Sequence, residues 1–275
     1  MNRNLIILLF LLTPLCLWSQ EDICIGKQYT LDSKVLHEKR SYWVHLPDNY
    51  DKNSKETYPV IYLLDGDSFF KAMVGMTHVL CSGRGKRMPE HIIVGVLNTD
   101  RTRDLTPTAS AAGRDGKISP GAAVEGGGSK NFSKFLTGEL RHAVDSAFRT
   151  NGHNVLIGHS YGGLFTMYTF LNHPELFDTY IAIDPSLWWD QAKLAKSAGS
   201  LIAGKDFTGK NLFVGTATKK RTDRVITHFH DADHLLSTTL PQVKGLHYFL
   251  KDFPDDTHGT VAIPGFYYGL MQLFK

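Results

Sequence analysis

The feature that most constrains this chain is the turn Gly158-His159-Ser160-Tyr161-Gly162-Gly163. The apolar residues 154–157 before it are typical of a buried strand, and residues 162–172 after it have a helical pattern. A strand, a G-x-S-x-G turn and a helix form the nucleophile elbow, which presents a serine hydroxyl above the end of a sheet. The motif alone is common by chance. Its place between strand and helix favours Ser160 as a nucleophile over an ordinary glycine turn.

Short apolar runs alternate with helix-like segments along most of the remaining chain. We expect strands at 59–64, 92–97, 154–157, 179–183, 211–214 and 247–250, and helices at 69–80, 132–148, 162–172, 191–201, 225–240 and 266–274. Runs that are apolar on both faces are typical of central strands covered by helices. Residues 28–46 alternate instead, which predicts an antiparallel N-terminal hairpin. The order predicts an α/β fold with a mainly parallel, doubly wound sheet in a single domain over residues 20–275.

The first 19 residues do not follow this pattern. Arg3 precedes the apolar run 5–12, and polar residues follow the run. A basic start, a short apolar core and a polar exit are typical of a secretory signal peptide. The run is shorter than the roughly 20 residues that span a bilayer. We therefore expect residues 1–19 to be a signal peptide and the protein to be periplasmic or secreted. Lipid anchoring at Cys16 is disfavoured because the residues before it are not small.

Charge and cysteine content limit the partners. The 275 residues carry a formal charge of +3, which falls to +2 when Arg3 leaves with the signal peptide. Such a small charge predicts neither a nucleic acid nor a membrane surface as partner. Cys24 and Cys81 remain, and an exported protein could pair them. Nothing in the sequence places them near each other, so we favour two free thiols and leave the disulfide open.

A serine hydroxyl needs a base that takes its proton and an acid that orients the base. The histidine of such a fold follows the last strand, and Asp255-Asp256-Thr257-His258-Gly259 occupies that place, so His258 is the predicted base. Asp223 is the first choice for the acid because it follows the strand at 211–214. The alternatives are Asp184, Asp231, Asp233 and a Ser–His pair without a carboxylate.

Other histidines lie in or near these segments. His159 belongs to the elbow but should point away from the site if Ser160 points into it. Residue types that bind metals gather further on, at His228, His230, Asp231, Asp233 and His234. They lie on a predicted helix and lack the spacing of a zinc-protease motif. We interpret them as a solvated helix face and expect no metal.

Five stretches together resemble the putative-esterase family of α/β-hydrolases. They are Y-P-V-I-Y-L-L-D-G at 58–66, N-T-D-R-T-R-D-L-T-P at 98–107, G-H-S-Y-G-G at 158–163, D-P-S-L-W-W at 184–189 and T-H-G at 257–259. The family includes esterase D, feruloyl esterases, enterochelin-type siderophore esterases and mycolyltransferases. The resemblance implies the α/β-hydrolase fold and an acyl-enzyme intermediate, and it supports Ser160 and His258. It does not settle the acid.

The resemblance also implies an oxyanion hole. In such enzymes one donor is the backbone N–H after the nucleophile, here Tyr161, and the other follows the Leu-Asp-Gly turn, here Asp67. Both would point at the oxygen that gains charge in the transition state. Family members often carry an apolar side chain after that turn, so the charge of Asp67 is a departure.

Three further segments are candidates for the substrate pocket. Trp188 and Trp189 follow the end of a strand, where ligands enter such sheets, although packing of a loop explains them equally well. Arg103, like Arg101, could hold an anionic substrate, although ion pairs with neighbouring aspartates are the favoured explanation. We expect the glycine-rich loop 113–128 to act as a lid.

The sequence therefore predicts a serine carboxylic ester hydrolase that acts on a small-molecule ester and needs no metal or organic cofactor. Ser160 attacks the ester, His258 carries the proton to the leaving alcohol, and water clears the acyl-enzyme. Three alternatives remain: a siderophore esterase acting on a catecholate triester, an acyltransferase, and a non-catalytic binding protein that retains the fold. We expect no nucleic acid partner and no stable membrane insertion. The oligomeric state stays open.

Overall fold

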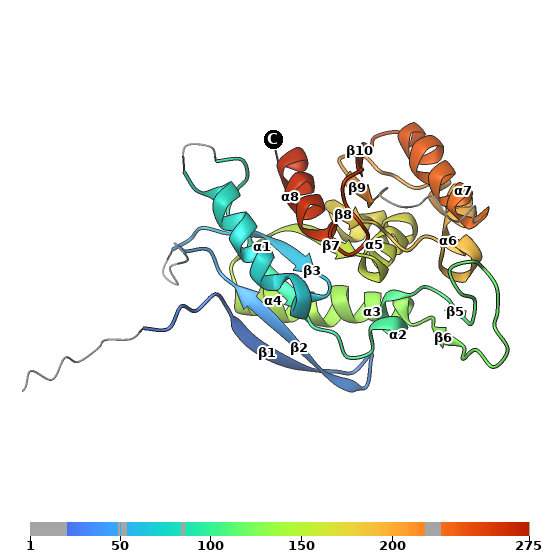
Figure 1. The fold of residues 1–275 in the computed structure, drawn as a ribbon. Helices are drawn as coiled ribbons and strands as arrows, with labels where there is room; N and C mark the ends of the chain where they lie inside the picture. The colour runs from blue at the N-terminus through green and yellow to red at the C-terminus, as the bar shows by residue number, and fades with distance from the viewer. Residues whose placement is uncertain (1–20, 49, 51–53, 84–85, 218–226, 275) are drawn as a thin grey trace, which may run out of the picture.

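The computed structural model describes residues 21–48, 50, 54–83, 86–217 and 227–274, with one eight-stranded sheet at its centre (Figure 1). The strands are β1 (Lys27–Ser33), β2 (Glu38–His45), β3 (Tyr58–Leu63), β4 (Ile92–Val96), β7 (Thr150–His159), β8 (Thr179–Ile183), β9 (Asn211–Ala217) and β10 (His247–Phe253). They follow one another across the sheet as β1-β2-β4-β3-β7-β8-β9-β10. The hairpin β1–β2 is antiparallel and pairs antiparallel with β4, and the strands from β4 to β10 are parallel. The predicted architecture is confirmed.

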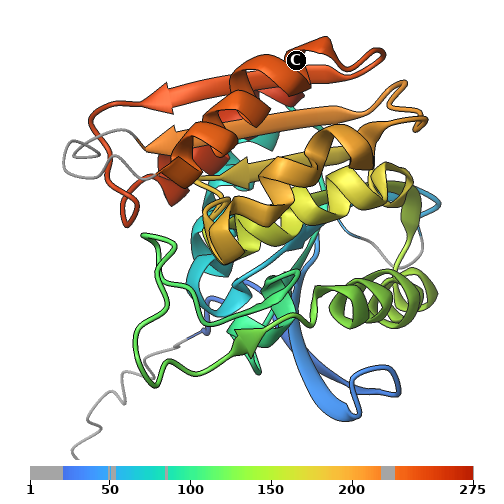
Figure 2. The same ribbon diagram turned by 90° about the vertical axis from the view of Figure 1, so that its right-hand side faces the viewer.

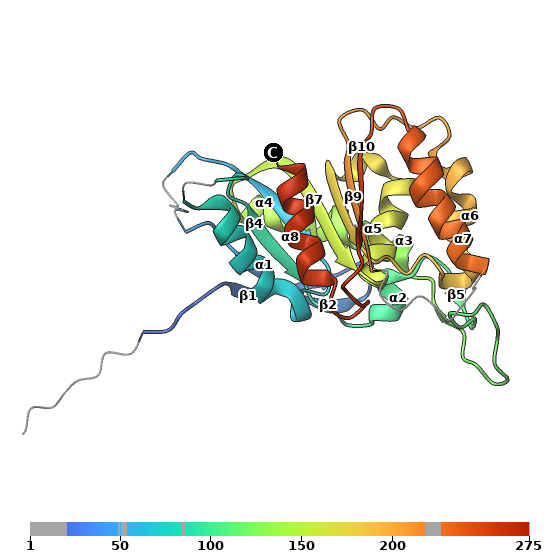
Figure 3. The ribbon, with the colours of Figure 1, turned by 45° about the horizontal axis from the view of Figure 1, so that its top comes forward.

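Helices cover both faces of this sheet (Figures 2 and 3). They are α1 (Gly66–Cys81), α2 (Arg101–Leu105), α3 (Ser129–Lys134), α4 (Arg141–Ala147), α5 (Tyr161–Asn172), α6 (Trp189–Ile202), α7 (Thr227–His234) and α8 (Ala262–Leu273). The side chains of α1 and α8 share one core with the sheet, and those of α3 to α7 share the other. The strands are therefore buried on both sides, which explains their continuous apolar sequence.

Strand β3 illustrates how one run serves two cores. All six of its residues are buried. Val60 and Tyr62 belong to the core under α5, whereas Ile61 and Leu63 belong to the core under α1 and α8. Successive side chains of a strand point to opposite faces, so a central strand needs apolar residues at every position.

The helix expected at 132–148 is interrupted. The chain forms α3, then a π-helical segment (Phe135–Leu140), then α4. Within that segment, the Glu139 carboxylate accepts hydrogen bonds from the backbone N–H groups of Lys34 at 2.9 Å and Val35 at 3.2 Å. The π-helical segment therefore contains Glu139, the residue that binds the backbone between β1 and β2.

The glycine-rich loop 113–128 is fastened at its base. The short strands β5 (Ala109–Ser110) and β6 (Glu125–Gly126) pair antiparallel there. The rest of the loop projects from the body (Figure 2), with Ile118 and Val124 exposed. The paired base is compatible with a lid, and movement of the loop stays a prediction.

Several expectations concern the chain outside its core. The predicted signal peptide, residues 1–19, lies outside the described residues. Among the residues that are described, no helix combines the length and the apolar composition needed to cross a bilayer. Cys24 and Cys81 are both free thiols.

The histidine- and aspartate-rich segment lies on α7. Across the described part of the chain, no three His, Cys, Asp or Glu side chains are grouped so that they could hold a metal ion. Asp231 lies 3.8 Å from the ammonium of Lys196 on α6 instead. The side chain of His228 is outside the described residues.

Acid is expected to destabilise the fold through His91, which precedes β4. This ring is buried, its edge meets Phe274 at 4.9 Å between centroids, and its Nδ1 donates to the Pro89 carbonyl at 2.7 Å. Burial lowers the pKa of His91 to about 4, below its usual value of 6.5. Between pH 6.5 and pH 4, His91 is protonated in the unfolded chain but not in the folded one. The free energy of unfolding is therefore highest above pH 6.5 and falls as the pH drops towards 4.

Urea unfolding at pH 7.5 and pH 5 measures this effect. We expect His91 to account for about 2 kcal/mol of the difference in unfolding free energy between the two pH values. The variant His91→Gln, which cannot titrate there, should lose that part of the pH dependence. An identical pH dependence in both proteins would show that His91 is not the group responsible.

Candidate active site

Ser160 lies in a sharp turn between β7 and α5. Its backbone angles, φ 60° and ψ −118°, are in a region that residues other than glycine rarely adopt. The neighbouring glycines make this turn feasible. A Cβ atom on Gly158 would lie 2.3 Å from the backbone of Gly162, and one on Gly163 would lie 3.0 Å from the carbonyl of Ile183. The G-x-S-x-G-G pattern is therefore a steric requirement of the strand–turn–helix geometry.

His258 reaches Ser160 from the far end of the chain. It lies in the loop between β10 and α8, and its Nε2 is 3.0 Å from the Ser160 hydroxyl oxygen. Its side chain is 35% exposed, so the imidazole is open on one side. The structure thus brings together the two residues that the sequence singled out as nucleophile and base.

Asp184 occupies the position of the acid. Its carboxylate Oδ2 is 2.6 Å from Nδ1 of His258, and its Oδ1 accepts the N–H of Ala217 at 3.1 Å. Asp184 directly follows β8 and has a positive φ of 39°, which turns its carboxylate toward β9 and the histidine loop. Asp184, Ser160 and His258 therefore form a continuous chain of contacts.

This geometry corrects the first choice for the acid. Asp223 lies outside the described residues, and the Nδ1 atom of His258 is engaged by Asp184. The alternative Asp231 pairs with Lys196. Proximity explains the difference: β8 lies next to β7 in the sheet, so a carboxylate at its end is one strand from the serine.

The two expected oxyanion donors lie at helix N-termini. Tyr161 is the first residue of α5 and Asp67 the second of α1, positions whose N–H groups have no partner within the helix. The turns before these helices adjoin: a Cβ atom on Gly162 would lie 3.1 Å from the Asp65 carboxylate. Two sets of backbone donors and two helix dipoles therefore meet beside Ser160, where they favour negative charge.

The carboxylates of Asp65 and Asp67, beside the expected oxyanion hole, are held by hydrogen bonds. Arg101 holds Asp65 with two hydrogen bonds, Nε to Oδ1 at 2.6 Å and Nη2 to Oδ2 at 2.9 Å. Asn98 donates to both Asp65, at 2.8 Å, and Asp67, at 3.0 Å. The Arg101 guanidinium also lies over the Tyr161 ring at 5.2 Å. The Asp65 charge is thereby neutralised beside the expected oxyanion hole.

Two residues at the site were not expected from the sequence. The buried hydroxyl of Ser186 lies 3.3 Å from the Ser160 hydroxyl. His159 was expected to point away from the site, and that expectation is wrong, because its Nε2 lies 2.8 Å from the carbonyl oxygen of His258. The His159 ring lies between Phe69 of α1, at 5.8 Å between centroids, and the ring of His258, at 4.7 Å.

Trp188 and Trp189 are packed rather than open to a ligand. They are 9% and 6% exposed, and both rings contact Tyr161, at 6.1 Å and 5.3 Å between centroids. The Trp189 indole N–H donates to the carbonyl of Thr108 at 2.8 Å. The Arg114 guanidinium lies over Trp188 at 5.2 Å. The tryptophans therefore anchor the loop from α2, which corrects the expectation that they form the pocket surface.

Arg103 is likewise committed to the fold. Its guanidinium makes two hydrogen bonds to Glu38 on β2, at 2.6 Å and 3.1 Å, and its Nε donates to Asp104 at 2.7 Å. The buried Arg40 joins the same cluster through Asp104 at 2.6 Å. The hydrogen bond from Arg103 is the main reason that the pKa of Glu38 lies below its usual value. The favoured explanation for Arg103, an ion pair with a neighbouring aspartate, is therefore confirmed, and the alternative role as a substrate-binding residue is corrected.

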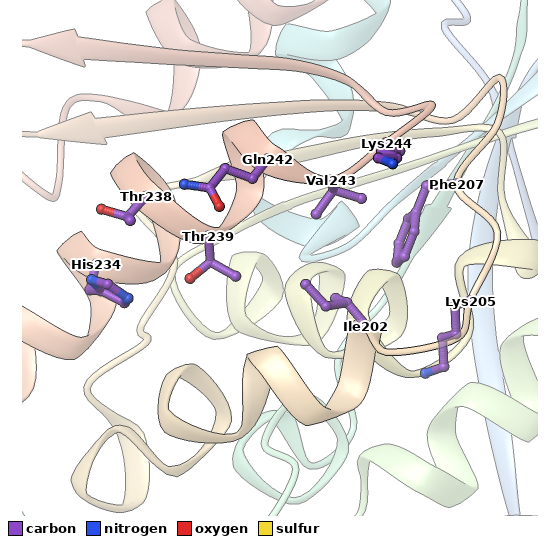
Figure 4. Close-up of a pocket in the computed structure, with 9 residues that line it drawn as sticks. All are labelled: Ile202, Lys205, Phe207, His234, Thr238, Thr239, Gln242, Val243 and Lys244. Atoms are coloured by element: carbon purple, nitrogen blue, oxygen red, sulfur yellow. The ribbon is translucent and has the colours of Figure 1, made fainter.

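A separate hollow lies elsewhere on the molecule (Figure 4). It has a volume of about 350 Å³ and lies between the end of α6 and the segment 234–244. Ile202, Phe207 and Val243 form its apolar side. None of Ser160, His258 and Asp184 lines it, so this hollow is separate from the three residues of the candidate active site.

Known proteins resemble this chain over most of its length. The model of the putative esterase family matches residues 33–223. The ferri-bacillibactin esterase BesA of Bacillus subtilis is 30% identical over 185 residues, which are 61% of this chain and 61% of that protein. The siderophore enterobactin esterase of Emericella nidulans is 27% identical over 251 residues, 78% of this chain and 81% of that protein. The crystal structure of an IroE-like serine hydrolase from Shewanella oneidensis superposes with a TM-score of 0.82 and 35% identity, covering 90% of this chain and 80% of the other.

Proposed function

This chain belongs to the putative esterase family, and from that premise we propose that it hydrolyses carboxylic esters with Ser160, His258 and Asp184. One observation carries the proposal: Asp184 Oδ2 lies 2.6 Å from His258 Nδ1, and His258 Nε2 lies 3.0 Å from Ser160 Oγ. These distances suit proton transfer from serine to histidine. The family match and the Shewanella serine hydrolase confirm the resemblance, the fold and the enzyme class predicted from the sequence.

The contacts define the proton positions. With its Nδ1–H donated to Asp184, the neutral His258 ring presents the Nε2 lone pair to the Ser160 hydroxyl. Ser160 Oγ attacks the ester carbonyl as its proton passes to Nε2, and Asp184 stabilises the resulting imidazolium. His258 then protonates the leaving alcohol, and a water molecule activated by the same nitrogen releases the acid.

The backbone N–H groups of Tyr161 and Asp67 are the proposed oxyanion hole. Their positions in the first turns of α5 and α1 support this role, because donors fixed by a helix need no rearrangement as charge develops. The Asp67 side chain is held by Asn98. The Asp67 carboxylate therefore does not need the Asp67 backbone N–H as a hydrogen-bond donor, and this N–H remains available to the oxyanion.

We propose that the substrate is a siderophore ester, of the catecholate triester class. The relatives in Bacillus subtilis and Emericella nidulans are named as esterases of ferri-bacillibactin and enterobactin. One cation, Arg114, supports an anionic ligand. Arg114 lies over Trp188 and, among the described residues, pairs with no carboxylate. Its charge is available on the loop that flanks Tyr161.

Rates on three esters test this substrate class. We expect kcat/KM for a catecholate triester to exceed that for a feruloyl sugar and for nitrophenyl butyrate by at least about tenfold, because only the triester engages Arg114. Arg114→Gln should lower kcat/KM for the triester several-fold and leave that for nitrophenyl butyrate unchanged. A faster reaction with the feruloyl sugar would overturn the substrate class and leave the serine mechanism intact.

Two controls separate the remaining functions. A sugar acceptor added to the assay yields a new ester if the protein is an acyltransferase. A protein that a fluorophosphonate probe does not label would be a binding protein, and both the ester hydrolysis and its substrate would then be rejected. Ser160→Ala supplies the unlabelled reference.

Export is a further part of the proposal. The basic residue and apolar run within 1–19 support cleavage after Ser19 or Gln20 and delivery outside the cytoplasm. N-terminal sequencing of the protein recovered from the producing cells should begin at Gln20 or Glu21. An intact Met1 would contradict export by this route.

A further inference from the structure

His159 touches the proposed base directly. Its Nε2–H donates to the His258 carbonyl oxygen at 2.8 Å, and the two rings lie 4.7 Å apart between centroids with 36° between their planes. On its other side, the edge of Phe69 from α1 meets the His159 ring at 5.8 Å. Phe69 in turn packs against Phe266 of α8 at 5.3 Å. His159 is therefore wedged between the helix layer and His258.

The loop that carries His258 is tied to the sheet by the bond from His159. Its own backbone bonds are local: Asp256 donates to Phe253 at 3.2 Å, and Thr260 and Val261 both donate to Thr257 at 3.0 Å. The bond from His159 instead connects the loop to β7. The residue after His159 is the nucleophile, so one strand end fixes both Ser160 and the backbone of the base.

We propose that His159 is a positioning residue, which holds the His258 imidazole between Asp184 and Ser160 by donating to the His258 carbonyl and stacking on its ring. The proposal rests on the proposed function, because it assigns His159 a role in the reaction of that triad. His159 would act through His258, whose backbone and ring it contacts.

The charge state of His159 fits this role. Burial, and then the charge of His258, lower the pKa of His159 to about 4, although the carboxylates of Asp184 and Asp65 act in the opposite direction. His159 therefore stays neutral at the pH of catalysis. A neutral ring offers its π face to the imidazolium that forms on His258, whereas a second cation would oppose proton transfer from Ser160.

A purely structural role would have a different signature. A ring that only fills space beside Phe69 could be replaced by phenylalanine without a change in kinetics, provided the protein folds. A positioning role depends on the N–H donor, so a side chain that keeps the donor should restore activity. The variants His159→Phe, which keeps the ring, and His159→Gln, which keeps an N–H donor, separate the two roles.

The readouts are kcat and KM on nitrophenyl butyrate, and the rate of fluorophosphonate labelling between pH 5.5 and 9. We expect His159→Phe to lower kcat and the labelling rate about 10- to 100-fold at unchanged KM, since a displaced base loses its alignment with the serine. Its pH–rate profile should also differ from that of the wild-type protein, because the displaced base loses its contact with Asp184. The kcat of His159→Gln should be at least about half that of the wild-type protein.

Wild-type kinetics and an unchanged pH profile in His159→Phe would overturn the proposal, as would equal losses in both variants. If His159→Phe does not fold, a comparison of His159→Leu with His159→Gln gives the same test. Labelling of the wild-type protein but not of Ser160→Ala keeps the test independent of the proposed function. If the wild-type protein itself is not labelled, the proposed function has failed instead.

Discussion

Asp184→Asn is expected to lower kcat about 10⁴-fold with little change in KM, the loss typical of a neutralised triad acid. The asparagine oxygen could still accept from His258 Nδ1, but no charge would stabilise the imidazolium. If the amide nitrogen faced the ring, it would favour the tautomer protonated on Nε2, which cannot accept the proton of Ser160. Steady-state hydrolysis of nitrophenyl butyrate gives both constants.

Asparagine is a suitable replacement at this position. Asp184 has a φ of 39°, and asparagine tolerates positive φ better than most residues. If its side-chain oxygen keeps the bond that Asp184 accepts from the Ala217 N–H, its amide nitrogen faces Nδ1 of His258. The variant should therefore fold, and circular dichroism should match the parent. The loss of activity can then be attributed to charge and tautomer.

Asp223→Asn and Asp231→Asn are the matched controls. Both should keep kcat within about twofold, since Asp184 occupies the acid position at His258 and Asp231 pairs with Lys196. A large loss in Asp223→Asn, together with an active Asp184→Asn, would reverse the assignment of the acid. Equal activity in all three variants would instead indicate a Ser–His pair that needs no carboxylate.

The sequence predicted the fold because its signals are local. Apolar runs such as 59–64 are buried on both faces of the sheet, and this requirement leaves a continuous pattern. Boundaries were less accurate where tertiary contacts decide them. Helix α8 begins at Ala262 rather than 266, with Pro264 in its first turn, where a missing N–H costs little. Strand β7 begins at the polar Thr150, which pairs with Tyr58 rather than packing in the core.

The nucleophile and the base could be found from the sequence for a similar reason. Each is defined by its place relative to neighbouring elements: the serine between a strand and a helix, the histidine after the last strand. The acid lacks such a definition. Several aspartates follow strand ends, and no local pattern says which of them lies beside the histidine loop, where the positive φ of 39° turns the Asp184 carboxylate.

Contacts over long sequence separations explain the remaining errors. Arg103 pairs with its neighbour Asp104 as favoured, but its second partner, Glu38 of β2, lies 65 positions away in the sequence. Similarly, Trp189 faces Thr108, and His159 faces His258. No periodicity in the sequence encodes these pairs. A motif therefore predicts a reacting residue better than it predicts the residues that hold it in place.

The largest loss is expected for Ser160→Ala, about 10⁶-fold in kcat, and His258→Ala should cost nearly as much. Serine attack requires transfer of its proton across the 3.0 Å contact to His258 Nε2. Each residue is thus ineffective without the other. We therefore expect the double variant Ser160→Ala/His258→Ala to be no slower than either single variant, with a residual rate due to the oxyanion hole and substrate binding.

The double-variant cycle tests whether the two side chains act as one unit. Independent effects would multiply, and the double variant would then lose far more than either single one. Such multiplication would contradict a mechanism in which the serine attacks as the histidine takes its proton. Matching residual rates would support it, since only backbone donors at Tyr161 and Asp67 and substrate contacts would remain. Circular dichroism spectra of the three variants should match that of the parent, because neither side chain belongs to the two apolar cores.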